Sequence, residues 1–155
     1  MKTATLILLL FIGAAIPVDG QMAVGYNTDG NTLSLSLKPF SKFWGEVRVN
    51  TTQYNQASWS YSDRGITQAY FMARVFSMTN ASLYAGVGPG ANLLSDEDDK
   101  WVSINIPAGI SLLPFQRFPN LYLTGEYTPM IVIAEGVPVI HSVSVGFRLL
   151  LTRVE

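Results

Sequence analysis

The sequence predicts an all-β protein, an eight-stranded antiparallel up-and-down barrel, and three observations favour this fold class. Apolar and polar residues alternate with a period of two in nearly every segment after residue 21, as expected for strands with two different faces. Turn residues separate eight such segments, an even number that lets consecutive hairpins close into a barrel. Only 14% of the 155 residues are charged and 48% are hydrophobic, whereas a soluble domain carries about 25% charged residues. Something other than water is therefore expected to cover part of the surface.

The N-terminus has the layout of a secretion signal. A single lysine precedes an apolar run from Ala4 to Ile16, about 13 residues, which is the length of a signal-peptide core and too short to span a bilayer. Val18 and Gly20 place small residues at positions −3 and −1 of a cut before Gln21. The predicted organisation is a signal peptide over residues 1–20 and one barrel domain over residues 21–155.

The predicted strands follow the alternation along the chain. They cover residues 22–28, 31–38, 43–52, 67–77, 81–91, 101–112, 120–129 and 140–151. The clearest is 101–112, where Val102 and every second residue after it are aliphatic while Ser103 and its alternates are small or polar.

The first two predicted strands have a defined register. A two-residue turn at Asp29–Gly30 sets Tyr26 opposite Leu33, Val24 opposite Leu35 and Met22 opposite Leu37. All of these apolar partners then share one face. The strand at 67–77 is less regular, because the parity that places Arg74 on the polar face also places Tyr70, Met72 and Phe76 there.

The distribution of charge between the two faces predicts a transmembrane barrel with a polar, filled interior. The polar face has too few charged residues for a solvated exterior, and the opposite face is aliphatic and aromatic over the roughly 9–11 residues that a tilted strand needs to cross a bilayer. Side chains just fill an eight-stranded barrel, so an internal ion-pair network is expected rather than an open pore. Its predicted members are Glu46, Arg48, Arg74, Glu126 and Arg148. A soluble, secreted lipocalin-like ligand-binding cup, with the faces reversed, is the alternative.

The connections are asymmetric. Those at 53–66, 92–100 and 130–139 are long and lie at one end, whereas those at the other end are short, as in outer-membrane barrels with external loops and periplasmic turns. Both termini are then periplasmic. Aromatic residues near the strand ends fit either an interfacial girdle or ordinary packing: Phe43, Trp44, Phe115, Phe118 and Tyr122 at the short-turn end, and Trp101 and Tyr127 at the other.

Two predicted external loops have compositions suited to surface contacts. The loop at 53–66 carries Tyr54, Trp59 and Tyr61 among Ser, Asn and Gln, a composition typical of adaptable recognition surfaces. The other carries the acidic run Asp96, Glu97, Asp98 and Asp99. This run can attract divalent cations that bridge lipopolysaccharide phosphates, but it lacks the ligand spacing of an EF-hand, and a solvated loop explains it as well.

Three segments carry a resemblance to a known family: Ser142-Val-Ser-Val-Gly-Phe-Arg-Leu-Leu-Leu151, Leu83–Gly88 and Asn120–Tyr127. Through them the chain resembles the small outer-membrane β-barrel proteins of Gram-negative bacteria. The last strand is similar to the C-terminal assembly signal of such barrels, with leucines where aromatic residues are usual. This resemblance implies insertion by the barrel assembly machinery, a place in the outer membrane at the cell surface, and contact with outer-membrane lipid and lipopolysaccharide.

Little in the sequence indicates catalysis. The net charge of −1 excludes an electrostatic nucleic-acid surface, and the absence of cysteine excludes thiol chemistry and cysteine-ligated metals. His141 is the only histidine, and Ser142 beside it points to the opposite face of the strand. We therefore expect no catalytic residue, metal or cofactor, and a structural or surface-interaction role through the external loops. The alternatives are a lipid-modifying enzyme that uses His141 and a catalytic pair formed by Glu46 and Glu126.

Overall fold

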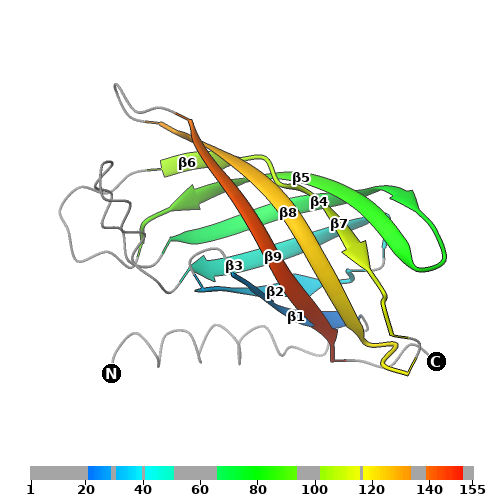
Figure 1. Cartoon of the computed structure of the whole chain (residues 1–155). Coiled ribbons are helices and arrows are strands. Elements are labelled where there is room, and N and C mark those ends of the chain that lie inside the picture. Colours follow the sequence, from blue (N-terminus) through cyan, green and yellow to red (C-terminus); the bar gives the residue numbers. More distant parts are fainter. Residues whose placement is uncertain are drawn as a thin grey trace, which may run out of the picture.

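Nine strands form one continuous antiparallel sheet in the computed structural model, which describes residues 21–28, 31–39, 41–50, 66–93, 102–115, 117–133 and 139–151 (Figure 1). The strands are β1 Met22–Asn27, β2 Thr32–Leu37, β3 Phe43–Asn50, β4 Thr67–Ser77, β5 Ala81–Ala91, β6 Val102–Asn105, β7 Ala108–Leu112, β8 Leu121–Val132 and β9 Ile140–Leu150. Seven of the eight predicted strands are found with ends within three residues of those expected, and the predicted strand 101–112 is found as two strands, β6 and β7.

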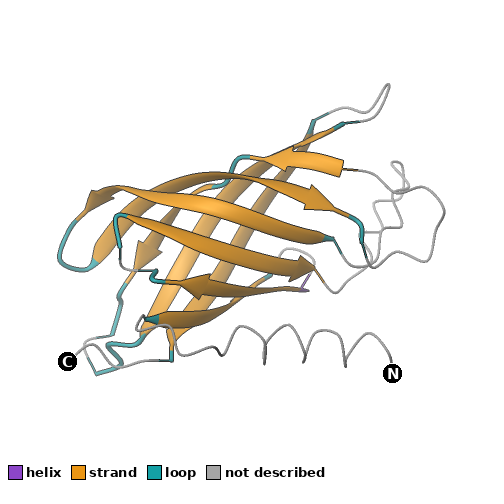
Figure 2. Ribbon diagram, turned by 180° about the vertical axis from the view of Figure 1, so that it is seen from behind, coloured by secondary structure: helices purple, strands orange, loops and turns teal. Residues whose placement is uncertain are grey.

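The sheet closes on itself in chain order. Strands β1 to β5 pair consecutively, β8 pairs with β9, and β9 returns to β1. Strands β6 and β7 both lie between β5 and β8 and together fill one position. The predicted eight-stranded antiparallel up-and-down barrel is thus confirmed. Figure 2 shows the strands of the near wall crossing those of the far wall at an angle, with the loops at the strand ends.

A proline divides what the sequence predicts as a single strand at 101–112. Pro107 has no N–H to donate to the sheet, and β6 ends just before it while β7 begins just after it. Hydrogen bonds on both sides still hold this point in the wall. The Gly86 amide donates to the Pro107 carbonyl at 2.8 Å, and the Ile106 amide donates to the Pro129 carbonyl at 3.1 Å.

The first hairpin has the predicted register. Tyr26 pairs with Leu33, Val24 with Leu35 and Met22 with Leu37. The intervening residues of both strands are buried. The apolar partners therefore share the outer face, and the small and polar residues face the interior.

Strand β4 departs from simple alternation because it contains a β-bulge. Arg74 pairs with Tyr84, but Phe76 pairs with the adjacent Leu83, so one residue of β4 is extra. A bulge shifts the facing of every residue beyond it. Phe76 is accordingly 51% exposed on the outer side, and its predicted place on the polar face is wrong.

Every charged residue of the described strands points inward. These residues are Glu46, Arg48, Arg74, Glu126 and Arg148, and all but Arg74 are at most 7% exposed. The outer face is apolar instead, with Val143, Val145 and Phe147 of β9 as examples that are 46% exposed or more. Within the described residues no helix has the length and apolar character to span a membrane.

Candidate functional site

The centre of the barrel interior is organised around the carboxylate of Glu46 on β3. Its Oε1 accepts a hydrogen bond from Arg48 Nε at 2.7 Å, and its Oε2 accepts from Arg148 Nη2 at 2.7 Å and from Ser36 Oγ at 2.8 Å. The Trp44 indole N–H lies 3.3 Å from the same Oε2. Glu46 and Arg48 are two residues apart on one strand, so the pleat directs both side chains into the barrel. Two cations and two neutral donors therefore satisfy this buried acid.

Arg48 connects opposite walls of the barrel. Its Nη1 and Nη2 both donate to the carboxylate of Glu126 on β8, the second at 2.8 Å. Strands β3 and β8 are four positions apart around the eight-position ring, so this two-pronged pair crosses the full interior. The Tyr84 hydroxyl at 3.0 Å and the Thr128 hydroxyl at 2.8 Å complete the donors to Glu126. Two acids and two arginines thus form one chain with balanced charge.

Buried aromatic rings pack around these ion pairs. The Arg48 guanidinium lies 4.6 Å from the centre of the Tyr70 ring, and the Trp44 and Tyr84 rings meet edge to face at 5.9 Å. Sequence reasoning places Trp44 among the candidate girdle residues, but it is 4% exposed inside the barrel. Its position in the sequence indicates that it faces inward, because Trp44 is two residues from the inward-pointing Glu46 and alternate residues of a strand share a face.

Arg74 lies toward the short-turn end of the interior, beside the chain formed by Glu126, Arg48, Glu46 and Arg148. Its Nη2 donates to the Pro39 carbonyl at 2.9 Å. With Tyr84, Tyr122 and Arg148 it lines an interior cavity of ≈ 10 Å³, about the volume that one water needs. The structure therefore brings four of the five predicted interior residues into direct contact and places the fifth beside them.

The interior geometry does not suit acid–base catalysis. Arg48 lies between Glu46 and Glu126 and bonds to both, so the two carboxylates do not share a proton as a catalytic pair would. No group of three or more potential metal-ligating side chains occurs among the described residues. Buried charges paired in this way can brace a structure and exclude solvent.

His141 lies on the outer face near the end of β9 that bears the long connections. Its Nδ1 is 2.7 Å from the Tyr127 hydroxyl, and the two rings stack with their centres 5.9 Å apart. Ser142 faces inward, in register with the buried Thr128. The histidine therefore contacts a phenol, and its sequence neighbour is on the other side of the wall.

The loop residues singled out by composition lie outside the described residues. They are Tyr54, Trp59, Tyr61, Asp96, Glu97, Asp98 and Asp99. The same holds for the predicted signal peptide. The strands on either side show where these loops start: Asn50, Ile66 and Asn92 are all at the end of the barrel opposite to the β2–β3, β4–β5 and β7–β8 turns.

Comparisons with known proteins give a structural neighbour but no relative by sequence. No protein-family model matches the chain, and no curated protein matches it. Among solved structures, the backbone structure of the Yersinia pestis outer membrane protein Ail in a phospholipid bilayer nanodisc is similar. The two chains are 16% identical, the match covers 85% of this chain and 98% of that one, and the TM-score is 0.48.

Proposed function

We propose that the protein is an outer-membrane β-barrel with a closed, ion-paired interior, and that it acts as a structural or surface-interaction protein through its external loops. The observation that carries this proposal is the complete separation of charge from the outer face. All five charged residues of the described strands point inward, and the outward positions, apart from His141 near one end of β9, are held by apolar, aromatic or small residues.

This arrangement suits a lipid surround on energetic grounds. Exposure of apolar side chains to water is unfavourable, but their exposure to hydrocarbon carries no such cost. Closure of the barrel also pairs every strand edge, as a lipid surround requires. A soluble cup needs the reverse arrangement, with apolar side chains around its ligand. Here the interior holds two Glu–Arg pairs and a cavity with room for about one water, which leaves no space for an apolar ligand at that level.

The orientation follows from the connections. The strand ends that bear the long connections lie at one end of the barrel, and the short turns lie at the other with Gln21 and Leu151. By analogy with barrels that have long external loops and short periplasmic turns, the long connections face the outside of the cell. The loops that start there are then the parts that meet a partner.

The test combines gel mobility with protease accessibility in cells that express the full chain. Boiled and unboiled membrane fractions are compared on SDS gels, and intact cells are digested and the cuts mapped. We expect a heat-dependent mobility shift and cuts confined to residues 53–66, 92–100 or 133–139, because β8 extends to Val132, three residues beyond its predicted end. Release of the protein without detergent, or cuts in the short turns of intact cells, would contradict the location or the orientation.

A conductance measurement tests the closed interior separately. Because Arg48 and Glu126 join opposite walls, the purified barrel in a planar bilayer should show no steady ion current. A sizeable steady conductance would refute the filled interior but leave the membrane location intact.

A further inference from the structure

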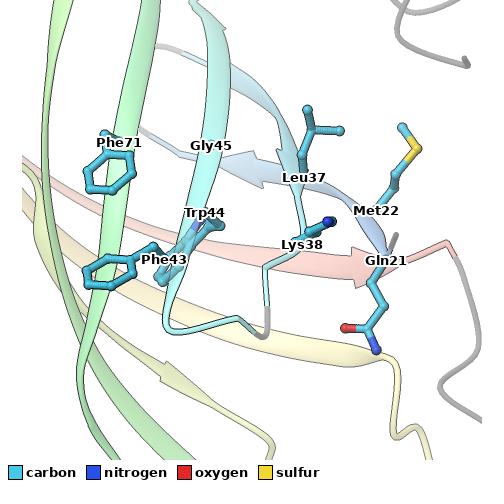
Figure 3. Close-up of a pocket in the computed structure, with 8 residues that line it drawn as sticks. All are labelled: Gln21, Met22, Leu37, Lys38, Phe43, Trp44, Gly45 and Phe71. Atoms are coloured by element: carbon cyan, nitrogen blue, oxygen red, sulfur yellow. The ribbon is translucent and has the colours of Figure 1, made fainter. Parts of the chain in front are cut away.

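The outer wall carries a groove at the short-turn end, across strands β1 to β4. It has a volume of ≈ 330 Å³, and the residues that line it are Gln21, Met22, Leu37, Lys38, Phe43, Trp44, Gly45 and Phe71 (Figure 3). Figure 3 shows Phe43 and Phe71 on one side of this groove and Met22 and Gln21 on the other. The interior ion pairs do not use it.

The groove arises from one glycine in a row of large side chains. Met22 pairs with Leu37, Leu37 with Gly45, and Gly45 with Phe71, so these four residues form a single row across the four strands. A Cβ built on Gly45 has nothing within 4 Å. The wall therefore has a notch between an exposed leucine and an exposed phenylalanine, and the stacked Phe43 and Phe71 rings, 5.6 Å apart, form one bank of it.

Two lysines flank this apolar groove. Lys38 lies on its rim, and Lys42 Nζ is 5.6 Å from the centre of the Phe43 ring. Both are exposed, and no ion pair joins either of them to another described residue. Both acids that the structure describes, Glu46 and Glu126, are inside the barrel. Among the described residues the rim is therefore positive, next to an apolar trough.

The conformation of Lys38 adds a second indication. Its φ is 57°, in the left-handed region that Gly and Asn occupy at lower cost. The turn itself is held by backbone bonds, from the Lys38 amide to the Gln21 carbonyl at 2.6 Å and from the Ser41 amide to the Lys38 carbonyl at 2.9 Å. A glycine or asparagine would make the same bonds with less strain, so what the lysine adds is an ammonium group at the groove.

We propose that this groove is a binding site for an anionic glycerophospholipid, with an acyl chain along the notch at Gly45 and the phosphate between Lys38 and Lys42. This inference depends on the membrane location and orientation proposed above, which place the short-turn end in the periplasmic leaflet. The chemistry matches in both parts: hydrocarbon fits the trough of Leu37, Phe43 and Phe71, and two ammonium groups at the interface attract a negative headgroup.

The test is native mass spectrometry of the barrel extracted in mild detergent, titrated with phosphatidylglycerol, phosphatidylcholine or lipid A. The wild type should retain one phosphatidylglycerol in preference to phosphatidylcholine. Gly45→Leu fills the notch and should weaken retention about tenfold, the loss expected when roughly two methylenes leave the groove. Gly125→Leu is the matched control, because Gly125 also faces outward and its Cβ meets only Ile110 at 3.6 Å.

The charge component is tested with Lys38→Asn and Lys42→Gln, each expected to weaken phosphatidylglycerol retention about fivefold. Arg117→Gln, an exposed cation in another turn at the same end, should change nothing. Asn suits the left-handed conformation, so Lys38→Asn should keep or raise the melting temperature while it lowers lipid retention. If the lysine were only structural, lipid retention would not fall while the melting temperature is kept or raised.

Three results would overturn the lipid site: equal retention by wild type and Gly45→Leu, equal retention of phosphatidylglycerol and phosphatidylcholine, or preference for lipid A. In each case a normal heat-dependent mobility shift would show that the protein still folds as a membrane barrel. Loss of that shift in the wild type would instead refute the membrane barrel on which the site depends.

Discussion

The pair between Arg48 and Glu126 offers the sharpest test of the interior, through a double-mutant cycle. Glu126→Gln leaves Arg48 with only one anionic partner, and Arg48→Met leaves Glu126 with only the Tyr84 and Thr128 hydroxyls. Removal of one member of a buried ion pair costs about 3–5 kcal/mol, because the other charge stays buried and unbalanced. We expect each single substitution to lower the free energy of unfolding by about 3 kcal/mol.

The double substitution tests whether Arg48 and Glu126 stabilise the barrel as a coupled pair or independently. It removes one positive and one negative charge together and leaves the Glu46–Arg148 pair balanced. We therefore expect the double variant to lose about as much stability as either single variant, a coupling of about 3 kcal/mol.

The assay is urea unfolding of the barrel refolded in lipid vesicles, followed by tryptophan fluorescence and extrapolated linearly to zero urea. Ser144→Ala is a suitable control, since Ser144 is a buried, inward-facing residue in register with Glu126 and should cost about 1 kcal/mol or less. If the losses in free energy of unfolding of the two single variants simply add in the double variant, the two residues are not energetically coupled and the proposed pairing across the barrel is wrong.

Three further predictions test the outer face and the closure of the barrel. Val145→Arg puts a charge at a position that is 62% exposed on β9, and in vesicles it should lower the free energy of unfolding by about 2–4 kcal/mol; an unchanged value would point to water on that face. Gly146→Ala should lower the melting temperature markedly, because a Cβ there would meet the Tyr26 carbonyl oxygen at 2.2 Å. If Gly146→Ala melts like wild type, the β1–β9 seam is looser than described. His141→Ala should leave the lipid A mass spectrum of overproducing cells identical to that of wild type, since the described partner of His141 is the Tyr127 hydroxyl; a difference between the spectra would support a catalytic histidine.

The interior network has a second consequence beyond stability. Replacing a buried ion pair with apolar residues is often neutral or stabilising, so such pairs are weak evidence for stability alone. In this barrel the residues that join the walls come from β3, β8 and β9, and a slip of one residue in any of these strands would turn a charge outward. The network therefore penalises wrong registers, which apolar packing alone would tolerate.

The sequence by itself determined which residues of each strand lie on the apolar face and which lie on the polar face. Alternation is a local property of an extended chain, so it predicted the limits of most strands (though not the division at Pro107), the register of the first hairpin and the inward direction of Glu46, Arg48, Glu126 and Arg148. It also indicated an even number of strands and the asymmetry of the connections. These features depend only on residues that are neighbours in the chain.

Only the tertiary structure decided which inward residues meet. Arg48 reaches Glu126 across the barrel because closure sets β3 opposite β8, a relation between residues 78 positions apart that no local pattern encodes. The bulge that turns Phe76 outward and the groove at Gly45 likewise depend on pairing with neighbouring strands. Pairing and closure are set by the packing of the whole sheet, so the sequence identified the faces and the fold decided the contacts.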